Sequence, residues 1–297
     1  MKHLHAAVIG ANGYIGKNLV KYLQDNYSID VDCYDIVKNT SMANCHCVDL
    51  TEKESVKEIN LDVDFVFMFA GLTGTLAGFD SYEKYIGVNE TGLLNLLDAI
   101  KESSYRPRVV FPSTRLVYKG NDKALAEDDL KETKTIYAVN KLACEGYLQA
   151  YHDSFDIPYT VFRICVPYGT LLSANYSYGT VGFFLKQASS EGVITLYGDG
   201  SLKRTFTHIS DLCYQIVEGS MKKESIGEIY NVGGEVATLR KIAEIIAEKY
   251  GVKVVCVPWP ERALRVESDH TYFDDTKISN LLGDISYKSI ERYIQDL

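Results

Sequence analysis

The chain has 297 residues, of which 46% are hydrophobic and 24% are charged, so it is long enough to bury the core of one large α/β domain or two modest ones. Its net charge of −9 argues against non-specific nucleic-acid binding and against docking on an anionic membrane, because both need a basic face. No apolar run approaches the roughly 20 residues that cross a bilayer, and residues 1–5 are too short and polar to begin a signal peptide. We therefore expect a cytoplasmic protein that contacts neither nucleic acid nor membrane.

The first predicted strand, residues 6–9, leads into a glycine-rich turn and an amphipathic helix. Glycine lets the backbone approach a phosphate closely, and the free N–H groups at the start of the helix stabilise its charge. We therefore expect this turn to bind the pyrophosphate of a dinucleotide, against the alternative of an ordinary strand-to-helix turn that needs glycine. The residues concerned are Gly10, Asn12, Gly13, Tyr14, Ile15 and Gly16.

The second predicted strand, residues 31–34, ends at Asp35, about 20 residues beyond the glycines. A carboxylate at this point accepts hydrogen bonds from ribose hydroxyls and repels a 2′-phosphate, which favours NAD over NADP. Cys45, His46 and Cys47 follow, but no second cysteine or histidine cluster completes a tetrahedral set, so we predict no metal. The seven cysteines are an odd number, scattered along the chain, and we expect them to be reduced.

Further strand-like runs alternate with helical patterns. The strands are expected at 63–69, 109–111 and 159–164, and the helices at 52–58, 91–101 and 135–151. This alternation predicts an α/β fold, a Rossmann doubly wound parallel sheet with helices on both faces. A ligand is then expected in the crevice outside the carboxyl ends of the strands.

After residue 167 the sequence becomes rich in Tyr and Gly and is predicted to form loops. This change in composition indicates a second lobe. Helices are expected at 181–190, 210–222 and 239–250, and an apolar strand at 228–232. We assign residues 1–167, with 206–234 returning to them, to a dinucleotide-binding domain. Residues 168–205 and 235–297 are assigned to a smaller, sequence-interleaved C-terminal substrate lobe.

Tyr137 and Lys141 stand four residues apart on the helix predicted at 135–151, and so share one face of it. A free phenol titrates near ~10, which is too high for a good base at neutral pH. An adjacent ammonium group and a positive nicotinamide ring stabilise the phenolate. The pair is a candidate acid–base site, and the alternative is an amphipathic surface pair.

Ser113 and Thr114, at the end of the fourth main strand, place hydroxyls where they can hold a substrate oxygen beside the phenol. With these residues the chain resembles the extended short-chain dehydrogenase/reductase family, specifically its NAD-dependent nucleotide-sugar epimerases and dehydratases. The resemblance covers nearly all of the chain. It implies a catalytic trio of Thr114, Tyr137 and Lys141.

The resemblance also implies where NAD binds. The glycine spacing matches the family's GxxGxxG, and Asp35 matches its ribose-binding acid. The other residues that the resemblance places at the cofactor are Asp49, Leu50, Phe69, Ala70, Gly71, Asn89, Tyr137 and Lys141.

Matches in the second lobe concern a nucleotide-diphosphate sugar. Arg204 begins a stretch that looks like the family's R-x-F-x-H-x-x-D-L, whose arginine clamps the diphosphate, and bidentate guanidinium binding suits that charge. The second diphosphate arginine would be Arg262 or Arg265, which the spacing does not decide. His208 in the same stretch is more typical of a packed structural histidine than of a catalytic one. The implied substrate-binding set is Thr75, Ser113, Thr114, Cys165, Tyr197, Arg204 and Arg265.

One departure from the family's sequence pattern makes one of its reactions unexpected for this chain. Arg115 and Leu116 follow Thr114, where the family's 4,6-dehydratases place Asp and Glu, so dehydration is not expected. The leading hypothesis is an NAD-dependent sugar-nucleotide epimerase, acting at C4 through a transient 4-keto intermediate. The alternatives are an NAD(P)H-dependent reductase of a 4-keto-6-deoxy sugar nucleotide and a non-catalytic dinucleotide-binding sensor. The resemblance also implies a homodimer, paired through the helices predicted at 91–101 and 135–151.

Overall fold

The structure is a computed structural model that describes residues 3–38, 45–172 and 178–297. Its strands are β1 (Leu4–Ile9), β2 (Ile29–Asp35), β3 (Cys45–Cys47), β4 (Phe65–Met68), β5 (Arg108–Thr114), β6 (Tyr159–Ile164), β7 (Val166–Tyr168), β8 (Val193–Tyr197), β9 (Lys203–His208), β10 (Glu228–Asn231), β11 (Glu235–Thr238) and β12 (Lys253–Val257). Its α-helices are α1 (Tyr14–Asn26), α2 (Lys53–Val56), α3 (Ala77–Asp80), α4 (Tyr82–Ile86), α5 (Gly92–Glu102), α6 (Ile136–Phe155), α7 (Gly179–Lys186), α8 (Ile209–Met221), α9 (Leu239–Tyr250), α10 (Glu261–Val266), α11 (Thr276–Leu282) and α12 (Ile290–Gln295).

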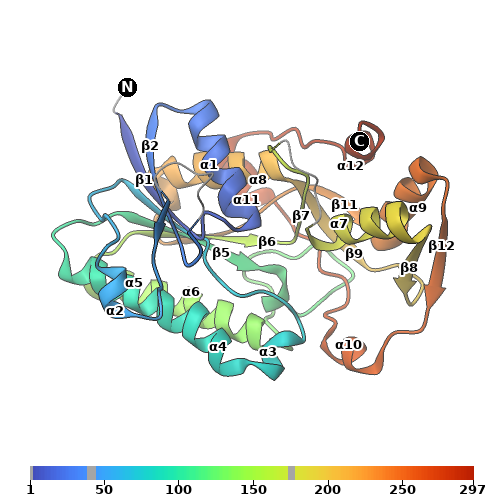
Figure 1. Cartoon of the computed structure of the whole chain (residues 1–297), viewed down its shortest axis with the longest axis horizontal. Coiled ribbons are helices and arrows are strands. Elements are labelled where there is room, and N and C mark those ends of the chain that lie inside the picture. The colour runs from blue at the N-terminus through green and yellow to red at the C-terminus, as the bar shows by residue number, and fades with distance from the viewer. Residues whose placement is uncertain (1–2, 39–44, 173–177) are drawn as a thin grey trace.

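A seven-stranded parallel sheet, in the order β10-β6-β5-β4-β1-β2-β3, forms the centre of the larger lobe. Helices α1, α8 and α11 cover one face, and α2, α4, α5 and α6 lie on the other (Figure 1). Successive residues of β1 point to opposite faces: Ala6 and Val8 pack in the core beneath α1 and α8, while Ala7 and Ile9 pack in the core beneath α5 and α6. The predicted doubly wound fold is confirmed.

In the sheet, β2 and β3 lie on one side of β1. The strands that come later in the chain, β4, β5 and β6, lie on its other side. β1 and β4 are therefore neighbours at the point where the strand order reverses. The carboxyl ends of two such strands leave a crevice between the loops that follow them, because those loops diverge. The glycine turn follows β1 and residues 69–71 follow β4, so both predicted cofactor segments lie at this point.

The smaller lobe contains two short sheets, β11-β9-β7 and β12-β8 (Figure 1). Its core lies between these strands and α7, α9 and α12. β10 returns to the large sheet beside β6, whereas β9 belongs to the small sheet, so the segment 206–234 contributes to both lobes. Within the described ranges, no helix combines the length and apolar character that a membrane span needs.

Three elements differ from the sequence-based expectations. The edge strand β3 consists of Cys45, His46 and Cys47. The sequence did not predict it, because three residues are too few to show an alternation of apolar and polar side chains. The helix expected at 52–58 is only the single turn α2. The helix expected at 181–190 ends as α7 at Lys186 and continues as a π-helical turn at Gln187–Glu191.

His208 is a packed histidine at the start of α8. Its ring lies 5.3 Å from the rings of both Tyr168 and Tyr293, and Nδ1 accepts the N–H of Ser210 as the helix N-cap. The side chain is 6% exposed, and burial, together with the charge of Lys288, lowers its pKa to about 4.

We expect His208 to make the fold less stable in mild acid. The unfolded chain binds a proton below a pKa of about 6.5, whereas the folded chain does so only below about 4, so stability is complete above pH 6.5 and falls as the pH drops toward 4. This one group should lower the free energy of unfolding by about 2 kcal/mol at pH 5 relative to pH 7.5. Urea melts at both pH values measure the difference. The His208→Asn variant keeps an N-cap acceptor and should show a smaller difference; an equal difference would contradict the assignment.

Candidate functional site

A cavity of about 500 Å³ lies at the carboxyl ends of β1, β2 and β4. Residues from five segments of the chain line it, and nine of the 17 are ones the sequence assigned to a cofactor. Those predicted residues are Gly10, Asn12, Gly13, Asp35, Asp49, Leu50, Phe69, Ala70 and Gly71. The structure therefore brings together nine of the fifteen predicted cofactor residues, which the chain distributes over 62 positions from Gly10 to Gly71.

The glycine turn has no space for a side chain at two of its glycines. Gly10 has φ +83°, and a Cβ there would lie 2.4 Å from the backbone nitrogen of Ala70. A Cβ on Gly16 would lie 2.1 Å from the carbonyl oxygen of Gly10. The turn thus presents backbone rather than side chains to the cavity at the start of α1, the arrangement that receives a pyrophosphate. The residues present fit a dinucleotide.

Two carboxylates border this cavity in fixed orientations. Asp35 Oδ2 accepts the N–H of Asn12 at 3.0 Å, and its Oδ1 accepts the N–H of Val37 at 3.1 Å. Asp49 Oδ1 accepts both the N–H and the hydroxyl of Thr51, at 2.9 and 2.7 Å. These bonds hold each side chain at the cavity wall; their contacts with ribose and adenine remain predictions.

Asn89 forms hydrogen bonds with the loop that follows β4. It lies in a π-helical turn, Gly87–Thr91, where Oδ1 accepts the N–H of Leu72 at 2.7 Å and Nδ2 donates to the carbonyl of Leu72 at 3.1 Å. A Cβ on Gly71 would lie 3.1 Å from Asn89 Oδ1 and 3.9 Å from Lys141 Nζ. The predicted cofactor residue Asn89 therefore fixes the backbone beside Gly71 and Lys141.

Tyr14 and Ile15 have structural contacts. The Tyr14 hydroxyl donates to the carbonyl of Gly169 at 2.8 Å, and its ring stacks on Tyr178 at 4.3 Å. Ile15 packs against the core under α1. Tyr14 thus connects the glycine turn to the segment that follows β7.

The predicted catalytic trio comes from two elements. Thr135 caps α6 by accepting the N–H of Ala138 at 3.0 Å, which places Tyr137 in the first turn of the helix and Lys141 one turn later. Thr114 ends β5, and its side chain hydrogen-bonds to Tyr137. Lys141 is buried, with Nζ 4.2 Å from the centre of the Phe111 ring and 5.9 Å from that of Tyr137.

Burial dominates the protonation of these groups. It raises the pKa of Tyr137 above its ordinary value, although the hydrogen bond from Thr114 acts in the opposite direction. Burial also lowers the pKa of Lys141 to about 8. In the protein without NAD the ammonium of Lys141 lies over the Phe111 ring, and burial is the largest influence on the pKa of Tyr137. That the Lys141 charge makes Tyr137 acidic stays a prediction for the complex with NAD.

Arg204, the predicted diphosphate clamp, is 2% exposed. Its Nη2 donates to Glu267 at 2.7 Å, and its Nη1 donates to the carbonyls of Lys203 and Asp269. Arg115 lies 3.7 Å from the same Glu267 oxygen, so two guanidinium groups share one carboxylate. Binding of a diphosphate to Arg204 remains a prediction, and it requires Glu267 to release this guanidinium.

Tyr197 borders a second cavity, of about 450 Å³, in the smaller lobe. Its ring is 5.3 Å from that of Trp259, and Phe183 lines the same cavity. The sequence analysis missed Trp259, although it is the only tryptophan of the chain and stands between Pro258 and Pro260. The three rings thus line one cavity, which we call the aromatic site.

The remaining predicted substrate residues are spread around the crevice. Cys165 Sγ donates to the carbonyl of Thr271, and Thr75 is exposed in the loop before α3. On α10, Arg262 pairs with Asp80 of α3 at 2.8 Å, while Arg265 pairs with Glu261 of its own helix. Both guanidinium groups are thus paired with a carboxylate at the surface of the smaller lobe.

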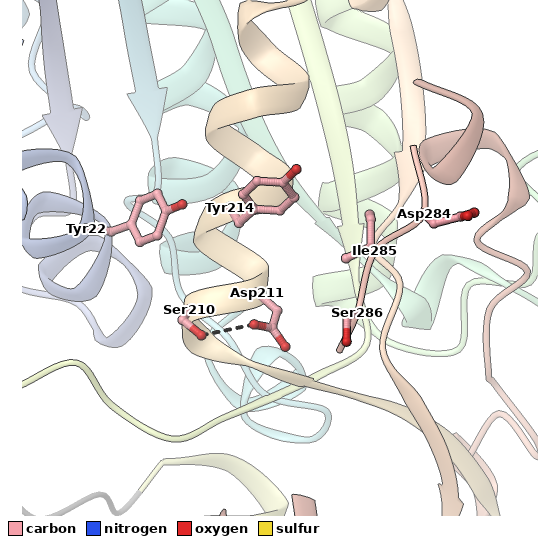
Figure 2. A pocket seen from close by; sticks show the side chains of 7 residues that line it. All are labelled: Tyr22, Ser210, Asp211, Tyr214, Asp284, Ile285 and Ser286. Carbon is pink, nitrogen blue, oxygen red and sulfur yellow. Dashed lines mark hydrogen bonds between the residues drawn. The ribbon is translucent and has the colours of Figure 1, made fainter. Parts of the chain in front are cut away.

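Another hollow, of about 330 Å³, lies between α1, α8 and the segment 284–286 (Figure 2). Tyr22 of α1 and Tyr214 of α8 line it, with the Tyr22 hydroxyl directed toward the Tyr214 ring, and the Ser210 hydroxyl donates to Asp211 at 3.0 Å. None of the residues that line it belongs to the predicted cofactor or substrate sets.

The sequence pattern of the NAD dependent epimerase/dehydratase family matches residues 6–233. The chain belongs to this family. Its cofactor is accordingly NAD, and the predicted family resemblance is confirmed. The matched range runs from β1 to the end of β10, so it includes the cavity and the trio of Thr114, Tyr137 and Lys141.

Similar family members come from several organisms. The low-salt glycan biosynthesis protein Agl12 of Haloferax volcanii is 26% identical, with 80% of this chain and 81% of that protein covered. A UDP-glucuronate 4-epimerase of Thermodesulfobacterium geofontis is 27% identical, with 83% and 80% covered. Among solved structures, the Thermus thermophilus UDP-glucose 4-epimerase in complex with NAD has a TM-score of 0.84 at 24% identity, with 98% and 97% covered.

Proposed function

We propose that this protein is a nucleotide-sugar epimerase that inverts C4 of the sugar through a transient 4-keto intermediate and regenerates its NAD in each turnover. The observation that carries the proposal is the assembly of Thr114, Tyr137 and Lys141 beside the cofactor cavity. The named relative from Thermodesulfobacterium geofontis, a UDP-glucuronate 4-epimerase, supports the same reaction and points to a UDP-sugar.

The chain's own groups provide the acid–base chemistry. Bound NAD would supply reversible hydride transfer at the sugar carbon, and the glycine turn after β1, with Asp35, would hold it. Tyr137, as its phenolate, removes the proton of the C4 hydroxyl and, as the resulting phenol, later gives it back, while Thr114 holds the same oxygen by a hydrogen bond. Because burial raises the pKa of Tyr137, its phenolate needs nearby positive charge, and the N-terminal end of α6 and Lys141 are the two sources on the same helix.

Epimerisation also requires the ketone to present its other face while it stays bound. The aromatic site of Phe183, Tyr197 and Trp259 lies in the smaller lobe, away from the trio on β5 and α6. A nucleotide held there anchors the substrate while the sugar rotates, so that binding and chemistry use different residues.

The direct test is incubation of the purified protein with UDP-glucuronate, UDP-glucose or UDP-N-acetylglucosamine, without added cofactor, followed by proton NMR of the sugar. The proposal predicts that one of these substrates yields its C4 epimer. Turnover of a 4-keto sugar nucleotide that consumes one added NAD(P)H per product would instead identify a reductase. Bound NAD without turnover of any of them would identify a dinucleotide sensor.

The cofactor preference gives a separate prediction. Asp35→Asn keeps the size of the side chain but removes the negative charge at the cavity wall. We expect the variant to bind NADP at least about tenfold more tightly than the wild type, because it lacks the repulsion of a 2′-phosphate. Calorimetric titration of the cofactor-free protein with both dinucleotides measures this, and an unchanged ratio of the two affinities would remove Asp35 from the ribose site.

The proposal includes a homodimer in the cytoplasm. Of the two helices expected to pair, α5 has Leu93, Leu96 and Leu97 buried in the core. We therefore place the contact on α6 and the neighbouring α4, which expose the apolar residues Tyr82, Ile86 and Val139. Seven unpaired cysteines are compatible with a reducing compartment. Light scattering should give twice the chain mass, and Val139→Glu should give a single chain; a monomeric wild type would contradict the dimer.

A further inference from the structure

A buried ion pair joins β6 to α6, the helix that carries Tyr137 and Lys141, and its carboxylate also binds β5, the strand that carries Thr114. Glu145 of α6 and Arg163 of β6 are only 5% and 3% exposed. Arg163 Nε donates to Glu145 Oε1 at 3.0 Å, and Nη2 donates to Oε2 at 2.6 Å. The hydroxyl of Ser113 donates to the same Oε1 at 2.5 Å. One carboxylate therefore holds groups from β5 and β6 to α6.

The spacing of these residues places the link next to the trio. Ser113 immediately precedes Thr114, and Glu145 stands one helical turn beyond Lys141, on the face of α6 that also carries Tyr137. The Ser113–Glu145 bond thus fixes the end of β5 against α6. A shift of that strand end along the helix would move Thr114 relative to the phenol.

The rest of the network immobilises the carboxylate. Arg163 Nη1 donates to the Tyr118 hydroxyl at 2.7 Å and to the carbonyl of Glu127 at 2.8 Å. The Tyr118 hydroxyl in turn donates to Asn231 at the end of β10, at 2.7 Å. A buried ion pair gives little net stability compared with apolar residues of the same size, because both charges lose their water. Stability alone therefore does not account for a charged pair at this place.

We propose that Glu145 is a positioning residue: by holding Ser113 it sets Thr114 of β5 in hydrogen-bond register with Tyr137 of α6, and Arg163 is the counter-ion that keeps its carboxylate in place. The inference rests on the proposed function, since it concerns the same trio. It assigns no contact with substrate or cofactor to Glu145 or Arg163.

Although the sequence assigns Ser113 to the substrate, its buried hydroxyl donates to Glu145. Ser113→Ala is therefore the sharpest test, because it removes the link to β5 and leaves the ion pair intact. We expect kcat to fall about tenfold, with KM within twofold of the wild type and NAD occupancy unchanged. A fluorinated tyrosine placed at position 137 gives a readout that does not need turnover, and its ¹⁹F resonance should shift in Ser113→Ala. Glu145→Asp, which keeps the charge but shortens the reach, should reproduce both effects.

Ser225→Ala is the matched control. Ser225 is also fully buried, and its hydroxyl accepts from the buried Arg108 at 3.0 Å, but it lies away from the trio, at the turn before β10. We expect it to lower the melting temperature about as much as Ser113→Ala does, with kcat and the ¹⁹F resonance unchanged.

Three results would overturn the inference: kcat and the ¹⁹F signal of Ser113→Ala both at wild-type values, equal changes in Ser113→Ala and Ser225→Ala, or a loss dominated by KM or by NAD occupancy. A wild-type protein inactive on every sugar nucleotide would refute the proposed function instead. The ¹⁹F shift would then still decide whether Ser113 and Glu145 position the phenol. If the Glu145→Asp variant does not fold, the results for Ser113→Ala alone decide whether the inference stands.

Discussion

Tyr137→Phe is expected to lower kcat for epimerisation by a factor of about 10² to 10⁴, because it removes the only atom that the trio uses to carry the proton of the sugar hydroxyl. The ring stays, so NAD and substrate should bind as in the wild type. The effect should therefore appear in kcat rather than in KM. Steady-state rates on the substrate identified by NMR, together with NAD occupancy from mass spectrometry of the intact complex, measure both.

Tyr147→Phe is the matched control for this change. Tyr147 lies on the same helix, but its hydroxyl donates to Glu90 at 2.9 Å, outside the trio. We expect this variant to keep kcat within a factor of about two, since a hydrogen bond to a charged group contributes to stability, by about 1.5–3 kcal/mol, rather than to the reaction. Wild-type activity in Tyr137→Phe would remove the phenol from the mechanism.

Gly16→Ala is expected to abolish NAD binding, with a loss of affinity of about 100-fold or more. The added Cβ would lie 2.1 Å from the carbonyl oxygen of Gly10 and 3.0 Å from Cα of Ala11, and both are backbone atoms that cannot move aside alone. The turn that receives the pyrophosphate must then open. Titration of the refolded, cofactor-free protein with NAD measures the loss.

Gly146→Ala provides the comparison for an added methyl group. Gly146 lies within α6, and a Cβ there meets nothing within 4 Å. We expect unchanged NAD affinity and a gain in stability of up to about 1 kcal/mol, since alanine favours a helix over glycine. If Gly16→Ala bound NAD as tightly as Gly146→Ala, the glycine turn would not be the pyrophosphate site.

The sequence predicts the cofactor half of the molecule well, for a physical reason. Gly10, Gly16 and Asp35 are set by local constraints, a turn without room for Cβ and a carboxylate at a strand end, and such constraints appear in the sequence as residue types at fixed spacing. The edge strand at Cys45–Cys47 has no such pattern, because three residues with little burial do not alternate clearly.

The contacts of the substrate half depend on residues brought together by the fold. The carboxylate that occupies Arg204 is Glu267, 63 positions later, and Trp259 meets Tyr197 from a similar distance along the chain. Nothing in the local sequence of either partner indicates the other. The raised pKa of Tyr137 was also not predictable from the Tyr–Lys spacing, because it arises from burial by segments remote in sequence.

The central claim is that Thr114, Tyr137 and Lys141 provide the acid–base chemistry for a hydride transfer in which the hydride leaves one sugar carbon and returns to the same carbon. The most direct measurement uses a UDP-sugar deuterated at C4, converted by the protein in ordinary water without added cofactor. The account predicts a C4 epimer that retains the deuterium at C4. Replacement of the deuterium by solvent hydrogen would contradict it, because inversion would then proceed by proton exchange at carbon.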